Sequence, residues 1–334
     1  MKETDMDTPA VTGTTSESRW STVLGAVVLL TAIVGVLLVA FAWPSVRSSV
    51  HDVPIAVAGP PTAVARTRAA LEQRMPGGFD ITEVADTAAA ERLIAERKVY
   101  GAIDVGAAAP QVLIASAGST AVAQTLQAVA TGLGAGSAGT SVVVRDLAAL
   151  PAADPRGSGL AAGTMPLVMG GLLAAVVLTR LVHGTGRRFV GACAFAVTGG
   201  LTVAAILQFW LGSLSGSYPA NAGAVGLVIA ATSLTVLGLE ALLGFAGIAV
   251  GAVIMMLVGN PLSGTATAPE MLPGWSGVFG GLLPPGAGGR VLRSTAFFDG
   301  RGAASAVAVL AAWVAVGALL CLVGGLRAPR GGRG

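Results

Sequence analysis

Six long apolar segments, one before and five after a polar stretch, dominate the pattern of hydrophobic and polar residues along the chain. The first, residues 21–43, has no charged residue and matches the length of about 20 residues that a membrane-spanning helix needs. Almost uncharged runs of similar length follow at 160–181, 189–211, 222–239, 241–259 and 303–326. The pattern predicts an α-helical polytopic membrane protein with six transmembrane helices, the last five forming a membrane domain at residues 159–326.

The polar stretch, residues 44–158, predicts an extracytoplasmic α/β domain inserted between transmembrane helices 1 and 2. Strand-like runs at Val53–Ala58 and Phe79–Val84 alternate with segments of helical spacing at 62–75 and 87–97. Further strands are expected at 99–105, 111–115 and 141–145, and a further helix at 119–133. We expect a sheet of about four or five strands with helices packed on it.

Composition also favours a membrane protein. The chain is 54% hydrophobic and 11% charged, with a mean hydropathy of +0.77, whereas about a quarter of the residues of an ordinary soluble domain are charged. A cleaved signal peptide is the competing interpretation of the first apolar segment, because Ala40-Phe41-Ala42 resembles a cleavage site. The segment exceeds the roughly 7 to 15 apolar residues of a signal peptide and lacks a basic stretch before it, so we expect an uncleaved anchor.

Arginines near the ends of the apolar segments predict the orientation, because positive residues in short loops stay in the cytoplasm. The loop between the second and third segments carries Arg180, Arg187 and Arg188, and the tail 327–334 is also basic. Both are predicted to be cytoplasmic, as is the N-terminal tail, residues 1–20, which we expect to be disordered. Many Ala, Gly and Arg residues with few lysines indicate a high-GC bacterium, so the predicted location is a bacterial plasma membrane.

The loop 260–302 is then predicted to lie outside, although Arg290, Arg293 and Arg301 in it count against that orientation. Its prolines divide it into pieces too short to span a bilayer, and Trp275 would anchor the apolar pieces at the membrane surface. We predict one or two short re-entrant or interfacial helices that gate the outer mouth. The predicted gate residues are Asn260, Pro261, Glu270, Pro273, Trp275, Pro284, Pro285 and Arg293.

Motifs for catalysis are missing from the sequence. The only lysines, Lys2 and Lys98, do not follow glycine, as the lysine of a P-loop must. The two histidines, His51 and His183, fall on opposite sides of the predicted membrane and cannot share a metal ion. We therefore predict that the chain is not an enzyme and binds no metal or cofactor itself. Because its positive charge is spread over all parts of the chain, no nucleic-acid partner is expected.

Several short stretches resemble a known family of membrane proteins. In the polar domain they are 53–57 (VPIAV), 97–103 (RKVYGAI) and 114–118 (IASAG). Farther along they are 259–264 (GNPLSG), 269–273 (PEMLP), 283–287 (LPPGA) and 292–293 (LR). With the order of one span, a polar domain and five spans, the chain resembles the permease subunits of ABC type-2 transporters. The branch it resembles is related to phage infection protein-like membrane proteins.

The resemblance implies the transmembrane subunit of an ABC-type exporter, with ATP and magnesium bound by a separate ATP-binding partner subunit. It also implies a second permease copy or a similar chain as a partner. Spans rich in Ala, Leu, Val and Gly suit a hydrophobic or amphipathic cargo. The alternative is a non-transporting membrane protein whose outer domain binds a cell-envelope, secretion or phage partner.

Coupling to an ATP-binding subunit would need a cytoplasmic surface, and the loop at 180–188 is the only substantial one between spans. The predicted coupling residues are Arg180, His183, Arg187 and Arg188. The same arginines would also set the orientation and meet anionic lipid.

Two further features lie within the predicted spans. Glu240, between the fourth and fifth spans, is either a functional intramembrane acid or a cap of a tight inner turn. Gly244, Gly247 and Gly251 put glycine on one face of the fifth span, where another backbone can approach closely. That face would pack either within one subunit or against a second copy.

Overall fold

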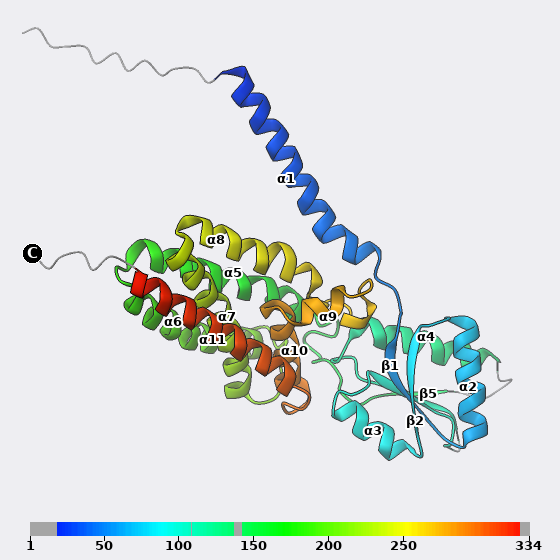
Figure 1. The fold of residues 1–334 in the computed structure, drawn as a ribbon. Helices are drawn as coiled ribbons and strands as arrows, with labels where there is room; N and C mark the ends of the chain where they lie inside the picture. The colour runs from blue at the N-terminus through cyan, green and yellow to red at the C-terminus, as the bar shows by residue number, and fades with distance from the viewer. Residues whose placement is uncertain (1–18, 108, 137–141, 328–334) are drawn as a thin grey trace, which may run out of the picture.

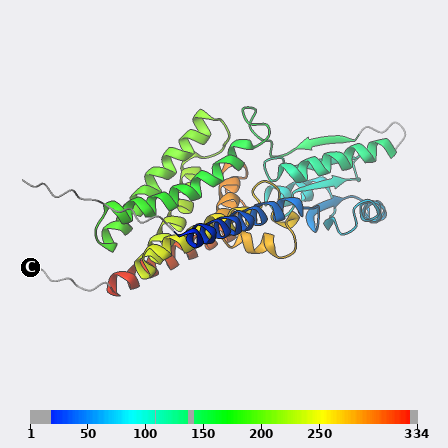
Figure 2. The same ribbon diagram turned by 90° about the horizontal axis from the view of Figure 1, so that it is seen from above.

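The computed structural model describes residues 19–107, 109–136 and 142–327, which form an α/β domain at one end of a helical bundle (Figures 1 and 2). The predictions for most of the N-terminal tail and for Arg330 and Arg333 fall outside the described residues. α1 begins, and α11 ends, at the side of the bundle away from the α/β domain (Figure 1). The polar stretch between the first two apolar segments therefore contains a sheet, as predicted, and its apolar cores also include Ala268, Met271 and Phe298 of the loop 260–302.

Five helices are long and apolar enough to cross a membrane. They are α1 (Trp20–Val46), α5 (Ser158–Leu181), α6 (Thr185–Ala205) with its continuation η1 (Ile206–Trp210), α7 (Tyr218–Leu243) and α11 (Ala304–Arg327). This architecture is that of a helical membrane protein. The predicted span 241–259 is instead a shorter apolar helix, Phe245–Gly259, so six full-length spans are not found among the described residues.

The break that was predicted beside Glu240 lies four residues later, at Gly244. The backbone of Gly244 has φ 62°, a conformation that glycine adopts without the steric cost paid by other residues. α8 (Phe245–Ala252) starts there, lies against α7 and continues as the π-helical segment η2 (Val253–Gly259). Glu240 therefore belongs to the last turn of α7 and does not lie in a turn between spans.

The α/β domain, which we call the outer domain after its predicted location, contains a five-stranded sheet in the order β2-β1-β3-β4-β5. Its strands are β1 (Val53–Ala58), β2 (Phe79–Val84), β3 (Gly101–Asp104), β4 (Gln111–Ile114) and β5 (Val143–Asp146). All neighbouring strands are parallel except β3 and β4, which form an antiparallel hairpin. The predicted alternation of strands and helices and the predicted strand number are confirmed.

Helices cover both faces of this sheet. α2 (Pro61–Arg74) and α4 (Thr120–Gly136) pack on one face, and α3 (Thr87–Ala95) packs on the other. Because side chains alternate along a strand, β1 serves both cores: Ile55 faces α2 and α4, whereas Ala56 faces α3. A three-layer domain with two separate cores results.

Short polar side chains fix where helices begin. The carboxylate of Asp86 accepts a hydrogen bond from the backbone N–H of Ala89 (2.8 Å) and caps α3. At the return to the bundle, Asp154 accepts hydrogen bonds from the N–H groups of Ser158 (2.9 Å) and Gly159 (2.7 Å). These bonds satisfy the free donors at the start of α5, where the chain enters the bundle again.

Helix α7 is the centre of the bundle. It packs against α5, α6, α8 and α11, and its side chains are buried over most of its length. The loop 260–302, predicted to contain short helices, contains η3 (Pro261–Ser263), η4 (Pro269–Met271), α9 (Ser276–Gly281) and α10 (Pro284–Phe297). α10 also packs on α7 and is largely buried, so much of this loop belongs to the folded core.

Helices α6 and α7 cross with their backbones in direct contact. A Cβ atom on Gly200 would lie 2.6 Å from the carbonyl oxygen of Ala222 and 2.9 Å from the Cα of Gly226. A Cβ on Gly226 would lie 2.8 Å from the carbonyl oxygen of Ala196. Both positions meet backbone, which cannot rotate away as a side chain can, so the crossing requires glycine.

We expect Gly226→Ala to lower the free energy of unfolding by roughly 1–3 kcal/mol, because the added methyl group forces the two helices apart. Gly223→Ala is the matched control, since Gly223 lies on the same helix and an added Cβ there would have no atom within 4 Å. Thermal unfolding of both variants in detergent measures the difference. Equal melting temperatures for the two variants would contradict the close crossing.

Candidate functional site

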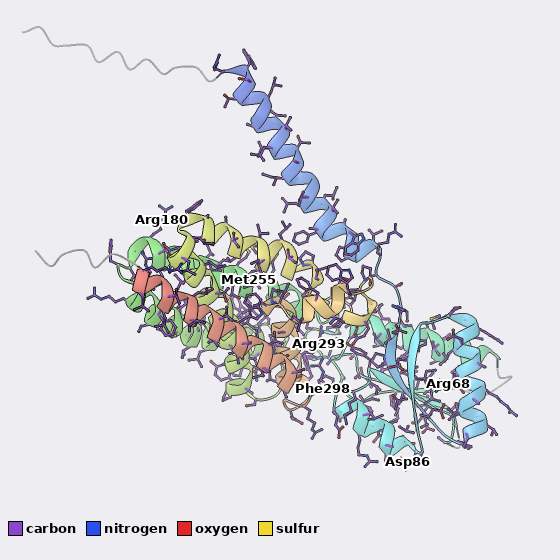
Figure 3. All side chains as sticks on the ribbon, viewed as in Figure 1. Arg68, Asp86, Arg180, Met255, Arg293 and Phe298 are labelled. Carbon is purple, nitrogen blue, oxygen red and sulfur yellow. The ribbon has the colours of Figure 1, made fainter. Side chains whose placement is uncertain are left out.

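A cavity of about 620 Å³ lies where the outer domain meets the bundle, and we call it the junction cavity. The outer domain contributes Arg97 and Tyr100, and the loop 260–302 contributes Glu270 and Arg290. The remaining lining is largely apolar and comes from Val99, Val278, Leu282, Phe298 and Val309. Arg293 and Phe298 mark the place of this junction in Figure 3, between the bundle and the sheet. Charged and apolar groups therefore converge on one partly open cavity.

Arg97 connects the two parts of the chain. Its Nη1 donates hydrogen bonds to the carbonyl oxygen of Arg290 (2.9 Å) and to Oγ of Ser294 (2.5 Å) on α10. Its guanidinium lies 5.1 Å from the ring centroid of Phe298, within the range of a cation–π interaction. Burial lowers the pKa of Arg97 from its ordinary value, and the neighbouring charge of Arg290 lowers it further. A cation is thus held in a place that water reaches poorly.

A second contact between the two parts is the hydrogen bond from the Tyr100 hydroxyl to the carboxylate of Glu270 (2.9 Å). Burial of the phenol and the negative charge of Glu270 both raise the pKa of Tyr100 above its ordinary value. Tyr100 therefore keeps its proton at neutral pH and remains a donor to Glu270.

Two arginines of α10 lie beside these groups. Arg290 donates to the carbonyl oxygen of Gly281 (2.8 Å), and Arg293 donates to that of Thr265 (2.8 Å). The Nε atoms of both side chains are buried and have no hydrogen-bond partner among the described residues. Both arginines therefore face the protein in the folded chain, and the orientation of the chain stays a prediction.

The predicted gate residues have different places in the structure. Glu270 lines the junction cavity, and Arg293 lines a smaller neighbouring cavity of about 120 Å³. The others shape the backbone: Asn260 and Pro261 lie where η2 passes into η3, Pro273 and Trp275 precede α9, and Pro284 and Pro285 begin α10. Trp275 is 68% exposed, as a residue at a membrane surface would be. Whether these segments gate a pathway stays a prediction.

The predicted coupling residues lie at the other end of the bundle, where Figure 3 labels Arg180. Arg180, His183 and Arg187 are exposed. Arg188 is turned inward instead: its Nη1 lies 3.0 Å from Oε2 of Glu240. Arg188 also donates to the carbonyl oxygens of Val182 (2.8 Å) and Thr179 (3.0 Å), so it is occupied within the chain.

The pairing of Glu240 with Arg188 differs from both hypotheses for Glu240, which were a functional intramembrane acid and a cap of a tight inner turn. The carboxylate pairs with a cation on α6 and so ties the end of α7 to the turn between α5 and α6. Their side chains are 20% and 14% exposed, so solvent screens the pair only in part. Its role in this structure is to join helices.

The three glycines that were predicted to form a packing face have two different roles in the structure. A Cβ on Gly247 would collide with the backbone of Leu239, and one on Gly251 would lie 2.8 Å from the Val236 side chain. Both glycines therefore pack α8 on α7 within the subunit. Gly244 faces open space and serves the turn, so it is not part of a packing face.

A second cavity of about 650 Å³, which we call the strand-end crevice, lies at the carboxyl ends of β1 and β3. It is lined by Gly59, Asp86, Thr87, Asp104 and Gly106, among others. The crevice lies at the point where the chain passes from one side of β1 to the other, which is where open α/β sheets commonly bind ligands.

Asp104 holds the floor of this crevice together. Its carboxylate accepts hydrogen bonds from the Thr87 hydroxyl, from Gln111 (3.0 Å) and from the N–H groups of Gly106 (2.9 Å) and Ala107 (3.2 Å). Burial alone would raise the pKa of Asp104, but these four hydrogen bonds together hold the pKa below its ordinary value of 3.8. Asp104 is therefore an ionised structural residue whose oxygens are already occupied.

Comparison of the chain with family models, with curated proteins and with solved structures gives no match. Among the described residues, no group of three or more His, Cys, Asp and Glu side chains is arranged to hold a metal ion. The family resemblance and the partners that it implies therefore stay predictions.

Sequence reasoning missed two residues of the junction cavity, Arg97 and Tyr100. Both lie in the stretch 97–103 that carries part of the resemblance, but neither was assigned a role. The available signal was an arginine and a tyrosine flanking a turn before a buried strand. Their partners on α10 and η4 are 193 and 170 residues away, beyond the reach of any local pattern.

We expect Glu240→Gln to lower the stability of the protein by about 1–3 kcal/mol, because Arg188 would keep its charge without an ionised partner. Arg188→Gln should lower the stability by at least as much, since it also removes two hydrogen bonds to carbonyl oxygens. The double variant should lose less stability than the two single variants lose together, and the difference should be about 0.5 kcal/mol or more. Thermal unfolding of the four proteins in detergent gives the coupling energy, and exposed Arg187→Gln is the control. Strictly additive losses would contradict the pair.

Asp104→Asn should destabilise the outer domain by roughly 1–3 kcal/mol at pH 7, because the amide donates where the native carboxylate accepts. The native pKa lies below 3.8, so folding favours the ionised form. The stabilisation is therefore complete above about pH 4 and is lost as the pH falls through the depressed native pKa. Hydrogen exchange of residues 101–107 in the full chain, at pH 7 and after acidification, measures both effects. Exposed Asp80→Asn is the control, and an unchanged acid response in Asp104→Asn would contradict the assignment.

Proposed function

We propose that this chain is the transmembrane subunit of an ABC-type exporter, which moves a hydrophobic or amphipathic cargo using ATP hydrolysed by a separate subunit. The observation that carries the proposal is the junction cavity, since it joins the outer domain to the short helices at the end of the bundle. A cavity with charged and apolar walls, at the end of a helical bundle, suits an amphipathic molecule on a path through the membrane.

The opposite end of the bundle supports the proposed partner subunit. Arg180, His183 and Arg187 are exposed there in a short loop and are available for contact with another protein. Arg188 is excluded from that surface by its pair with Glu240. In this proposal ATP and magnesium bind to the partner, and the exposed loop transmits its movement to α5 and α6.

A second permease copy is part of the proposal. α1 is exposed along its length, and its packing against the rest of the chain involves η2 and η3 near its C-terminal end. In Figure 1 it diverges from the bundle as it runs away from the outer domain. A helix with so little intramolecular packing is free to line an interface between two subunits.

We also propose that the protein lies in a bacterial plasma membrane with both termini in the cytoplasm. The exposed Arg180 and Arg187 at the loop between α5 and α6 support this orientation, because positive residues in short loops stay in the cytoplasm. The outer domain and the junction cavity would then face the outside of the cell.

The strand-end crevice favours a second candidate function. It lies on the outer domain, away from the junction with the bundle, and at the position in the sheet where ligands commonly bind. A non-transporting protein that binds a cell-envelope, secretion or phage partner through this crevice would need no ATP-binding subunit.

Affinity purification of the tagged protein from its native membrane tests the proposal directly. We expect an ATP-binding cassette subunit in stoichiometric amount, and a several-fold loss of it from the double variant Arg180→Gln/Arg187→Gln. Arg66→Gln/Arg92→Gln is the matched control, because it removes two exposed arginines from helices of the outer domain. Reproducible absence of such a subunit from the native preparation would overturn the exporter and leave the binding function. Retention of the subunit by the loop variant would refute the coupling surface.

A further inference from the structure

The junction cavity is surrounded by more positive than negative charge. Three guanidinium groups, those of Arg97, Arg290 and Arg293, lie near one carboxylate, that of Glu270, so positive charge exceeds negative charge among these four side chains. None of the three arginines forms an ion pair with a described residue. The other charged residues of the lining are exposed: Lys98 pairs with Glu96 (2.8 Å), and Asp52 lies 3.2 Å from His51, a contact that is an ion pair only with a protonated imidazole.

Neutral groups hold the three guanidinium groups in place without cancelling their charge. Their acceptors are three backbone carbonyl oxygens and one hydroxyl oxygen. The buried Nε atoms of Arg290 and Arg293 have no acceptor among the described residues. Buried charge without a counter-charge is costly, so this arrangement is most stable when an anion is present.

The shape of the bound anion follows from the other wall of the cavity. Val278 of α9 and Leu282, the residue after α9, line the cavity and are 75% and 54% exposed. Val309 of α11 continues the apolar lining. An apolar chain attached to the anion could therefore leave the cavity along α9 and α11 without crossing a polar surface.

Arginine is suited to one class of anion in particular. Its planar fork of donors matches the oxygens of phosphate, and a tetrahedral phosphate can accept from several guanidinium groups at once. A volume of about 620 Å³ accommodates a headgroup and the first part of a chain rather than a whole lipid.

We propose that the junction cavity binds the phosphate headgroup of an anionic amphipathic molecule, with Arg97 and Arg290 facing the phosphate and the apolar chain lying along α9 and α11. Arg293 adds positive charge from behind the cavity wall. The site makes no use of ATP. It rests on the proposed function only in that the bound amphipath would be the cargo of the exporter.

The test uses the full-length protein, purified in an uncharged detergent, and three probes. Dodecyl phosphate should raise the melting temperature in a saturable manner, whereas dodecylphosphocholine, with the same chain and no net charge, should not. Inorganic phosphate should bind far more weakly, because it lacks the chain. Equal stabilisation by the zwitterionic probe would overturn recognition of the charge. Equal affinity for inorganic phosphate would overturn the amphipath and indicate a site for the free anion.

Variants then locate the site. Arg290→Gln should weaken binding of dodecyl phosphate about tenfold to a hundredfold, because a charged hydrogen bond is lost. Arg290→Lys should retain part of the affinity, and exposed Arg301→Gln should retain all of it. Unchanged binding in Arg290→Gln would place the probe elsewhere and overturn the proposal. Should a variant fold poorly, the comparison of probes on the native protein still decides the matter.

The result of the binding test with the three probes does not depend on the presence of an ATP-binding partner. Selective binding by a protein that never co-purifies with an ATP-binding subunit would refute the exporter and uphold the site. Co-purification without selective binding would uphold the exporter and refute the site.

Discussion

The contact between Arg97 and α10 is the interaction on which the arrangement of the two parts depends. It joins residues 193 and 197 positions apart, and it brings a cation from the turn between α3 and β3 onto a helix of the bundle. The backbone at Arg97 has φ 59°, a conformation that few residues other than glycine adopt. Such a conformation persists where the surroundings hold it, and here the two hydrogen bonds and the ring of Phe298 do so. The junction cavity exists because this contact keeps the two parts together along one side.

Close backbone packing around the cavity leaves little freedom in the loop 260–302. A Cβ atom on Gly277 would collide with the carbonyl group of Pro269, and one on Gly280 would collide with that of Leu262. α9 is therefore held against η3 and η4 without side chains between them. Movement of α9 would require these segments to move with it as one unit. The junction cavity is for that reason better described as a fixed site at the end of the bundle than as a space closed by a loose loop.

The outer domain was predictable because its signals are local. The apolar run of β1, the alternation along β2 and the Gly and Pro residues between segments marked its elements to within a few residues. The bundle was less predictable, because the apolar run from 222 to 259 gives no periodic signal where the chain turns. A single acid suggested a break at Glu240, whereas the backbone turns at Gly244. The sites were the hardest part, since Arg188 and Glu240 meet across 52 residues and the sequence offers no reason to pair them.

The arginines at the two ends of the bundle differ in their pairing and burial, which the amino-acid composition does not show. At one end Arg188 is neutralised by Glu240, while Arg180 and Arg187 remain at the surface. At the other end Arg290 and Arg293 point into the protein and are held by carbonyl oxygens. A count of arginines by loop treats all of these as equal, although their surroundings in the folded chain differ. Among the described residues, Arg290 and Arg293 form no ion pair, so their charge is the part of the pattern that the proposed anion would balance.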